Sequence, residues 1–172
     1  NEFEFDLLIY ATGFDGVTGP YDRIDIKGKD DRSLKEEWTK VPRTLFGMQV
    51  EGYPNMLMIL GPHTARGNIP RNIEEVVEWQ TDLIGFMMEN KFDRVEPNSA
   101  AVDEWITTVS KASEGLLSSK IASWQTGVNR NVEGRSAPRV LGYNGGAVRY
   151  RKIIQDVATR EYQEFVFSQV SQ

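Results

Sequence analysis

The stretch that decides the fold class runs Phe5-Asp6-Leu7-Leu8-Ile9-Tyr10-Ala11-Thr12-Gly13. Its apolar half predicts a buried strand over residues 5–13, and its small residues let the strand end approach something flat or charged. Gly13 suits that place because it can take a positive φ and has no Cβ. Ligands of α/β folds lie at such strand ends, so we expect an α/β fold. A strand so close to a first residue that is not Met also predicts a fragment of a larger protein.

The composition is that of an ordinary globular domain. The chain has 172 residues, of which 40% are hydrophobic and 26% charged, enough for one real core. A net charge of −5 offers phosphates no basic patch, so we expect no nucleic-acid partner. The absence of Cys rules out disulfides, thiolate chemistry and Cys-based metal sites. No apolar run approaches the roughly 20 residues that span a bilayer, and we expect a cytoplasmic protein without a membrane partner.

Apolar periodicity and chain breakers predict the other elements. The apolar run over residues 56–60 predicts a second buried strand, because Gly61-Pro62 stops it. Between the two strands, scattered Gly and Pro residues indicate an irregular β-rich excursion over 14–54. The later elements are a helix over 72–90 with Asn72 as its N-cap, a helix over about 99–117, a loop over 125–139, a helix over about 146–160 and an edge strand over 162–166.

Both predicted strands end on glycine, at Gly13 and Gly61. The second leads through a loop into the N-terminus of the helix that is expected to begin near Asn72. Free N–H groups at a helix N-terminus suit an anion or the electron-rich edge of a ring such as a flavin. The alternative, an ordinary strand–turn–helix without a ligand, stays open for either glycine alone. No Gly-x-Gly-x-x-Gly occurs, so these residues encode no complete dinucleotide-binding fold.

Three ionisable residues follow Gly61. His63 is the single histidine and cannot build a metal site alone, so a structural or backbone role is favoured over acid–base work. Arg66 and Arg71 flank the same loop, where they could either pair with a phosphate or simply be solvated. The candidates for a nucleophile lack partners, and we assign no catalytic residue.

Trp124 stands at the edge of the loop over 125–139, which has no apolar period and is predicted to be mobile. A Trp beside a mobile loop that contains glycine could cover a ligand and donate its indole N–H. A position at the boundary of the core is the alternative for Trp124 taken alone.

Together these signals resemble one family. The matching pieces, in order, are Asp6-Leu-Leu-Ile-Tyr-Ala-Thr-Gly-Phe-Asp15, Gly52-Tyr-Pro-Asn-Met-Leu-Met-Ile-Leu-Gly-Pro62, Gly67-Asn-Ile-Pro70, Ile73-Glu74, Val77-Glu-Trp79, Ser123-Trp124-x-x-Gly127-x-Asn129, Leu141-Gly-Tyr-Asn-Gly-Gly146 and Arg149-Tyr-Arg151. The chain resembles the C-terminal part of a Baeyer–Villiger monooxygenase of the cyclohexanone monooxygenase type. Ala-Thr-Gly alone occurs in many flavoproteins, whereas the ordered set is specific.

The resemblance implies an enzyme that binds FAD and NADPH and uses O2 to turn a ketone into an ester or lactone. The implied fold is the C-terminal part of a two-dinucleotide-binding flavoprotein, partnered by the upstream FAD and NADP domains of the same enzyme. Residues 1–90 would complete the FAD-binding domain, and residues 91–172 would form a mostly helical segment with 125–139 as a lid. The cofactor-binding residues carried over by position are Thr12, Gly13, Gly61, Pro62, His63, Asn68, Ile69 and Trp124.

Some positions depart from the family pattern. Where the family's substrate loop often has a bulky aromatic residue, this chain has Arg66-Gly67, and a second aromatic position is Gly142. We therefore take Arg66, Gly67 and Gly142 as substrate-binding residues and expect a wider pocket for a bulky or polycyclic ketone. His63 stands where the family often has Asn.

The resemblance also implies parts that these 172 residues lack. The two Rossmann glycine motifs, the fingerprint motif and the family's active-site arginine belong upstream, so the segment alone should not catalyse. Two alternatives remain. One is an N- or S-oxidising flavin monooxygenase, against which the tail after Trp124 speaks. The other is a non-catalytic binding module that completes a fold or an interface.

Overall fold

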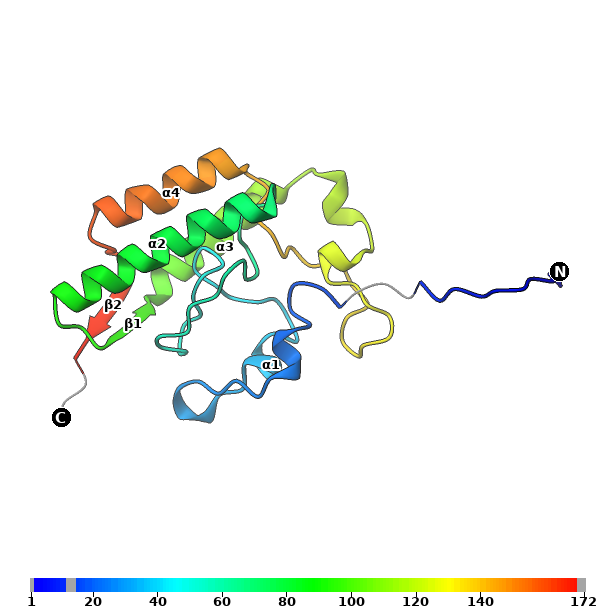
Figure 1. Ribbon diagram of the computed structural model, residues 1–172, viewed down its shortest axis with the longest axis horizontal. Coiled ribbons are helices and arrows are strands. Elements are labelled where there is room, and N and C mark those ends of the chain that lie inside the picture. Colours follow the sequence, from blue (N-terminus) through cyan, green and yellow to red (C-terminus); the bar gives the residue numbers. More distant parts are fainter. Residues whose placement is uncertain (1, 12–14, 170–172) are drawn as a thin grey trace.

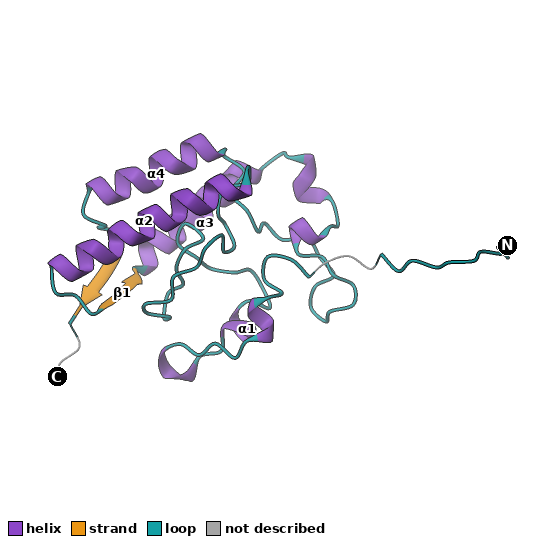
Figure 2. Cartoon of the chain, viewed as in Figure 1, coloured by secondary structure: helices purple, strands orange, loops and turns teal. Residues whose placement is uncertain are grey.

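Three long helices and a two-stranded sheet dominate the part of the chain that the computed structural model describes, residues 2–11 and 15–169 (Figures 1 and 2). The helices are α2 (Ile69–Glu89), α3 (Ser99–Ser113) and α4 (Ala147–Thr159). Strand β1 (Arg94–Pro97) pairs antiparallel with β2 (Phe165–Ser168). The shorter elements are α1 (Leu34–Glu37) and the 3-10 turns η1 (Tyr21–Arg23), η2 (Lys29–Asp31), η3 (Leu117–Lys120) and η4 (Trp124–Thr126).

Helix α2 begins one turn earlier than the sequence suggested. Asn68, rather than Asn72, is the N-cap, and its Oδ1 accepts a hydrogen bond from the Arg71 N–H at 3.1 Å. Pro70 lies in the first turn, where its missing N–H costs no helical hydrogen bond. Asn72 lies inside the helix and is buried, and its side-chain amide donates to the Ala65 carbonyl oxygen at 3.0 Å.

The second half of the chain follows its predicted order closely. Asn98 caps α3 through a hydrogen bond from the Ala101 N–H at 2.8 Å. This helix ends at Ser113 instead of 117, because the chain then turns at Gly115, which has φ +74°. Helix α4 lies within the predicted range. The predicted edge strand is shifted to Phe165–Ser168, and its partner β1 carried no clear signal in its four residues.

The core lies between these helices and the sheet. Helix α2 contacts α4, and the indole N–H of Trp79 donates to the Ile154 carbonyl oxygen at 2.7 Å. Aromatic rings make up much of the interior, as in the edge-to-face pair of Phe46 and Trp105, whose centroids are 5.1 Å apart. The buried cluster comprises Leu45, Phe46, Met48, Ala65, Val76, Trp79, Leu83, Val95, Val102, Trp105, Val109, Tyr143, Tyr150, Ile154, Val157, Tyr162 and Phe165.

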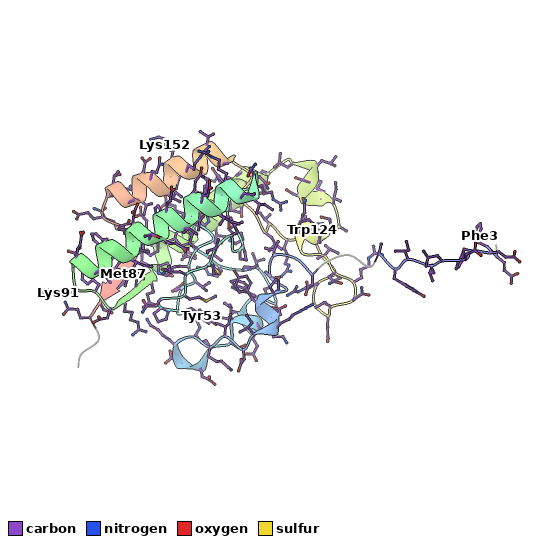
Figure 3. The ribbon with its side chains drawn as sticks, viewed as in Figure 1. Phe3, Tyr53, Met87, Lys91, Trp124 and Lys152 are labelled. Atoms are coloured by element: carbon purple, nitrogen blue, oxygen red, sulfur yellow. The ribbon has the colours of Figure 1, made fainter. Side chains whose placement is uncertain are left out.

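The predicted strand over residues 5–13 is wrong for its described part, residues 5–11, which form no strand. These residues extend away from the helices as an arm, and Phe3 lies near its far end (Figures 1 and 3). The apolar side chains of the arm, such as Leu7 and Ile9, are exposed. A strand needs a neighbour to receive its hydrogen bonds, and none of the described residues pairs with the arm.

The β predictions over residues 14–54 and 56–60 also fail for their described residues. Residues 56–60 form no strand, because turns and side chains satisfy their backbone groups. The Met58 N–H donates to the Met48 carbonyl oxygen, and the Met58 carbonyl oxygen accepts a hydrogen bond from the Gln80 side-chain amide at 2.7 Å. In place of a β-rich excursion, residues 15–54 fold into η1, η2 and α1 with two isolated bridges, Lys27 to Ser33 and Leu45 to Gln49. Tight turns at Gly and Pro residues interrupt this stretch before longer strands can pair.

Within residues 2–11 and 15–169, no helix combines the length and the apolar content that crossing a membrane requires.

Candidate functional site

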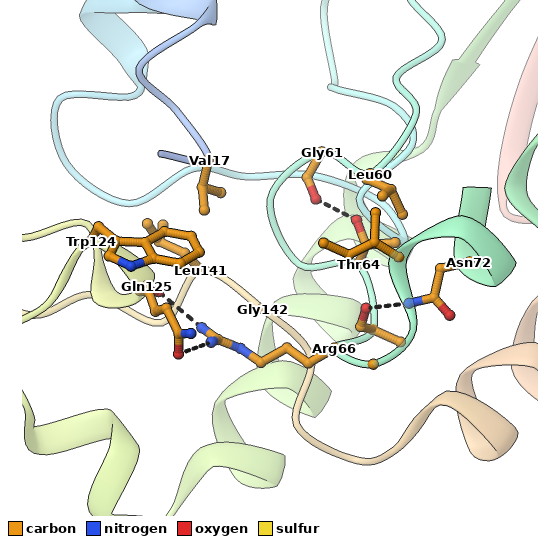
Figure 4. A pocket seen from close by; sticks show the side chains of 13 residues that line it. Val17, Leu60, Gly61, Thr64, Arg66, Asn72, Trp124, Gln125, Leu141 and Gly142 are labelled. Atoms are coloured by element: carbon orange, nitrogen blue, oxygen red, sulfur yellow. Dashed lines mark hydrogen bonds between the residues drawn. The ribbon is translucent and has the colours of Figure 1, made fainter. Parts of the chain in front are cut away.

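A cavity of about 320 Å³ opens beside the N-terminus of α2 (Figure 4). Four stretches that are far apart in the sequence meet there: Val17, residues 60–72, residues 124–125 and residues 141–142. The lining residues are Val17, Leu60, Gly61, Thr64, Ala65, Arg66, Gly67, Ile69, Asn72, Trp124, Gln125, Leu141 and Gly142.

A short parallel pairing brings two of these stretches together. Ala65 forms a parallel bridge with Tyr143. The Tyr143 N–H donates to the Thr64 carbonyl oxygen at 2.9 Å, and the Arg66 N–H donates to the Tyr143 carbonyl oxygen at 3.3 Å. Because residues 63–66 run alongside 141–143, Arg66 lies next to Gly142 although 76 positions separate them in the sequence.

The turn at Gly61 is packed closely and leads toward α2. A Cβ at Gly61 would lie 2.6 Å from the Gly47 carbonyl oxygen, so only glycine fits there. The Thr64 hydroxyl donates back to the Gly61 carbonyl oxygen and closes the turn. Ile69, the first residue of α2, also lines the cavity, so the positive end of the helix dipole lies at its edge.

Trp124 forms another wall of the cavity. Its side chain is half-exposed, and its ring lies against Gly16, where a Cβ would come within 2.7 Å of the indole Cε3. Figure 3 places Trp124 on the side of the molecule from which the N-terminal arm leaves. Gly16 therefore provides the flat surface on which the indole rests.

Arginine side chains fasten the loop over 125–139. Arg135 is 4% exposed and forms ion pairs with both Asp15 and Asp22. Burial raises the pKa of Asp22, against the opposing effect of Arg135. At the end of the loop, Arg139 donates to the carbonyl oxygen of Lys40 at 2.9 Å. The predicted mobility of the loop stays a prediction, whereas these contacts fix the place at which it rests.

Arg66 connects the Gly61 loop with the Trp124 segment. Its Nη1 donates to the Gln125 side-chain oxygen and its Nη2 to the Gln125 carbonyl oxygen, both at 2.9 Å (Figure 4). A Cβ at Gly142 would lie 2.6 Å from Arg66 Nε, so the Arg66 side chain fills the space that Gly142 leaves. Partial burial lowers the pKa of the guanidinium, which still stays charged because arginine keeps its proton in proteins.

His63 takes a structural place. It is 1% exposed and is not among the residues that line the cavity. Burial lowers the pKa of His63 to about 4, so the ring is neutral, and its Nε2–H donates to the Val140 carbonyl oxygen at 3.1 Å. The Thr44 hydroxyl lies 3.1 Å from Nδ1 and 2.8 Å from the Pro62 carbonyl oxygen, and its one proton serves one of them at a time.

The cavity brings together six of the sequence-predicted site residues: Gly61, Arg66, Gly67, Ile69, Trp124 and Gly142. Three others, Pro62, His63 and Asn68, lie in the same loop but do not line it. The loop's other arginine, Arg71, pairs with Glu75 at 3.1 Å. Thr12 and Gly13 lie outside the described residues.

Sequence reasoning missed several lining residues, among them Thr64 and Leu141. Gln125 is the most informative of them, because it is the first residue of the predicted loop and receives both Arg66 hydrogen bonds. Its only sequence signal was its place directly after Trp124.

The charge of the cavity is simple. Among its described lining residues, Arg66 is the one that carries a charge, and no carboxylate is present. Residues 2–11 and 15–169 also contain no group of three or more His, Cys, Asp and Glu that could hold a metal ion. The arrangement can therefore bind and orient an electron-rich group, while its own side chains offer no acid–base pair.

Comparisons with known proteins match nearly the whole of this chain. Phenazine N-monooxygenase PhzNO1 of Lysobacter antibioticus is 37% identical over 165 residues, covering 96% of this chain and 30% of that protein. Cyclohexanone 1,2-monooxygenase of an Acinetobacter species is 38% identical over 162 residues, covering 94% of this chain and 29% of that protein. A cyclohexanone monooxygenase from Rhodococcus sp. Phi1, solved bound to NADP+, matches with a TM-score of 0.89 at 34% identity, covering 98% of this chain and 31% of that one.

The chain is homologous to Baeyer–Villiger monooxygenases. No family model matches it. It spans about 30% of the length of the curated relatives that it matches. The expected fold class, part of a two-dinucleotide-binding flavoprotein of the α/β class with a mostly helical second half, is confirmed.

Proposed function

We propose that the chain forms one wall of the shared flavin and NADP site of a Baeyer–Villiger monooxygenase. The whole enzyme would use NADPH and O2 to convert a cyclic ketone into an ester or lactone. One observation carries the proposal: six residues singled out from the sequence, three as cofactor-binding and three as substrate-binding, line a single cavity in a chain that is homologous to cyclohexanone monooxygenases.

The cavity fits part of a flavin. Its volume of about 320 Å³ lies near the lower end of the roughly 300–1,000 Å³ common for ligand sites, so it suits one ring system rather than a whole dinucleotide. Gly61 lines the cavity, and the positive end of α2 at the cavity edge favours the ring edge on which charge collects. FAD would supply the redox chemistry.

The residues have different tasks in this proposal. Gly61 and Ile69 would face the flavin, and Trp124 would contact the ribose of the nicotinamide nucleotide. Pro62, His63 and Asn68 would act through the shape of the loop, which His63 and Asn68 hold by hydrogen bonds to Val140 and Arg71. Thr12 and Gly13 would lie near both nucleotides. This chain contributes binding, orientation and exclusion of water rather than a catalytic residue.

Of the two positions at which the sequence predicts a wider substrate pocket, Gly67 and Gly142, only Gly67 favours a bulky ketone. Arg66 fills the space beside Gly142, so the missing aromatic ring there leaves no room for substrate. Gly67 is exposed, and a Cβ there would only touch Ala147 at the ordinary van der Waals distance of 3.7 Å. We propose that a bulky ring enters past Gly67.

The test uses the full-length protein with bound flavin. We expect it to oxidise NADPH faster when a cyclic ketone is present, and mass spectrometry should find one added oxygen atom in an ester or lactone. A large cyclic ketone should give a higher kcat/KM than cyclohexanone. A colourless protein would overturn the flavin site and favour a binding module, while a clear preference for cyclohexanone would overturn only the wide pocket.

A second candidate is N-oxidation. In the sequence analysis, the tail after Trp124 argued against N-oxidation. The relative named phenazine N-monooxygenase, however, aligns over 165 of the 172 residues, and this alignment includes most of that tail. The tail therefore does not separate the two reactions. Incubating the same enzyme with a phenazine and with a cyclic ketone separates them, because one yields an N-oxide and the other a lactone.

The placement of the segment in its enzyme is also a proposal. Residues 1–90 would complete the FAD-binding domain, and the exposed apolar arm, residues 2–11, is the part that most needs a neighbour. Residues 91–172 would form the helical segment and lid. A cytoplasmic location belongs to the same proposal.

A further inference from the structure

We propose that Arg66 is a positioning residue, whose side chain clasps the Trp124–Gln125 segment over the cavity and so sets how often the lid stands open. The lid is the loop over residues 125–139, which Trp124 directly precedes. This inference rests on the proposed function, because it describes how that site is closed. It concerns a contact between two segments rather than a contact with a cofactor.

The clasp has two bonds with different chemistry. Arg66 Nη1 donates to the side-chain oxygen of Gln125 and Nη2 donates to its main-chain oxygen, each at 2.9 Å. Two N–H groups on a planar guanidinium fix both distance and angle, which a single donor cannot do. The main-chain bond holds the segment whatever side chain stands at 125, and the side-chain bond adds to it.

Both ends of the clasp are anchored. At the Arg66 end, the backbone N–H donates to the Tyr143 carbonyl oxygen at 3.3 Å, within the parallel pairing of Ala65 and Tyr143. The side chain then passes Gly142, which has no Cβ to block it. At the other end, the 3-10 turn η4 is held by the Gly127 N–H, which donates to the Trp124 carbonyl oxygen at 3.0 Å. A pull on Gln125 therefore moves Trp124 with it.

The hydrogen bonds of the clasp are weaker than the ion pairs elsewhere in the lid, so the clasp can open first. Among the described residues, Arg66 forms no ion pair, and both of its acceptors on Gln125 are neutral. A hydrogen bond to a neutral oxygen is weaker than one to a carboxylate. Arg135, at the far side of the lid, instead pairs with two carboxylates, those of Asp15 and Asp22. Because the weaker fastening lies nearest the cavity, this end of the lid should release first.

Release at this end has a defined consequence. Trp124 rests on Gly16 and lines the cavity beside Val17, so its departure opens the cavity to water. In a monooxygenase, one oxygen atom of O2 enters the product and the other leaves as water, and NADPH supplies the electrons. Water and solvent access favour loss of the oxidising equivalent without product. A weakened clasp should therefore lower the product formed per NADPH oxidised.

The experiment replaces Arg66 in the full-length flavin-bound enzyme. Arg66→Met keeps an unbranched apolar stem and removes both donors. Hydrogen exchange is followed at the amides of Thr126, Gly127 and Val128, which are bonded within η4. We expect exchange at least about tenfold faster, because two hydrogen bonds from a charged group are lost, together with a lower ratio of product to NADPH. Unchanged exchange would overturn the clasp.

A matched control is Arg71→Met. Arg71 lies five positions further on and pairs with Glu75, and it does not touch Gln125. The same replacement there should leave exchange at η4 and the product ratio unchanged. Equal effects of the two variants would mean that a general loosening, rather than the clasp, is responsible, and would overturn the proposal.

Gln125 supplies a test of opposite sign. Gln125→Glu gives Arg66 a charged acceptor, so exchange at η4 should slow severalfold. Gln125→Ala removes one of two bonds and should speed exchange less than Arg66→Met does. Faster exchange in Gln125→Glu would contradict the clasp. The exchange rates are measured without turnover, so they test the clasp even if the enzyme forms no ester. Altered exchange rates without any ketone oxidation would overturn the proposed function and would still support the clasp.

Discussion

The helical region and the segments around the cavity are held together by different forces. In the helical region, α2, α3, α4 and the sheet bury apolar side chains such as Val102 and Trp105 almost completely. Around the cavity, long arginine side chains reach across to carbonyl and carboxylate oxygens. Apolar burial is lost only by unfolding, whereas single polar contacts can open and close. The difference indicates a rigid scaffold beside an edge that responds to ligands.

The largest expected effect separates the two regions with a pair of tryptophans. Trp105 is 3% exposed in the core and Trp124 is 47% exposed at the cavity. Trp105→Ala should destabilise the protein by about 3–5 kcal/mol, because it leaves a cavity in a packed interior. Trp124→Ala should leave the thermal midpoint nearly unchanged and should instead weaken nucleotide binding. Thermal midpoints of both variants, measured by calorimetry, provide the check. Similar losses of stability would contradict the claim that the core and the cavity edge are held together by different forces.

Arg135 tests whether the lid depends on its buried ion pairs. Arg135→Met would leave Asp15 and Asp22 together without their cation. Removing one partner from buried ion pairs costs about 3 kcal/mol, and we expect the cost to appear as local opening of residues 125–139. Limited proteolysis should cut that loop much faster while α3 stays intact. Lys152→Met serves as the control, since its pair with Asp156 is exposed.

His63 gives a smaller effect that depends on pH. Its pKa is lowered to about 4 in the folded protein, against about 6.5 when unfolded. A lowered folded pKa means that the stabilisation is present above pH 6.5 and is lost as the pH falls toward 4. Between pH 8 and pH 5 the loss amounts to about 2 kcal/mol. His63→Asn, which introduces the family's common residue, should flatten the fall in the thermal midpoint over this range. An unchanged slope would show that other groups cause it.

The sequence predicted the helical region well, because helices depend on neighbouring residues. Val76 and Leu83 repeat at helical spacing and are buried in α2. The start of α2 was misplaced because Asn68 and Asn72 are both good capping residues, and Pro70 looked like part of the loop. The strand predictions over residues 5–13 and 56–60 failed because a strand exists only with a partner, and apolar residues alone do not specify one.

The site was predictable only in part, for a related reason. Gly61 was found because a turn that needs glycine leaves a local signal, and Gly67 was found through the family resemblance. Gln125 and its bonds to Arg66 were missed because they join residues 59 positions apart. The filling of the space at Gly142 by Arg66 was equally invisible, and it reverses part of the wide-pocket argument.

The most direct test of the central claim is hydrogen exchange in the full-length enzyme with and without NADP+. The account predicts that binding protects residues 61–69 and 124–128, which line or adjoin the cavity, and leaves α3 and α4 unchanged. Protection confined to the helices, or no change in residues 61–69 and 124–128, would contradict the placement of the nucleotide site at this cavity.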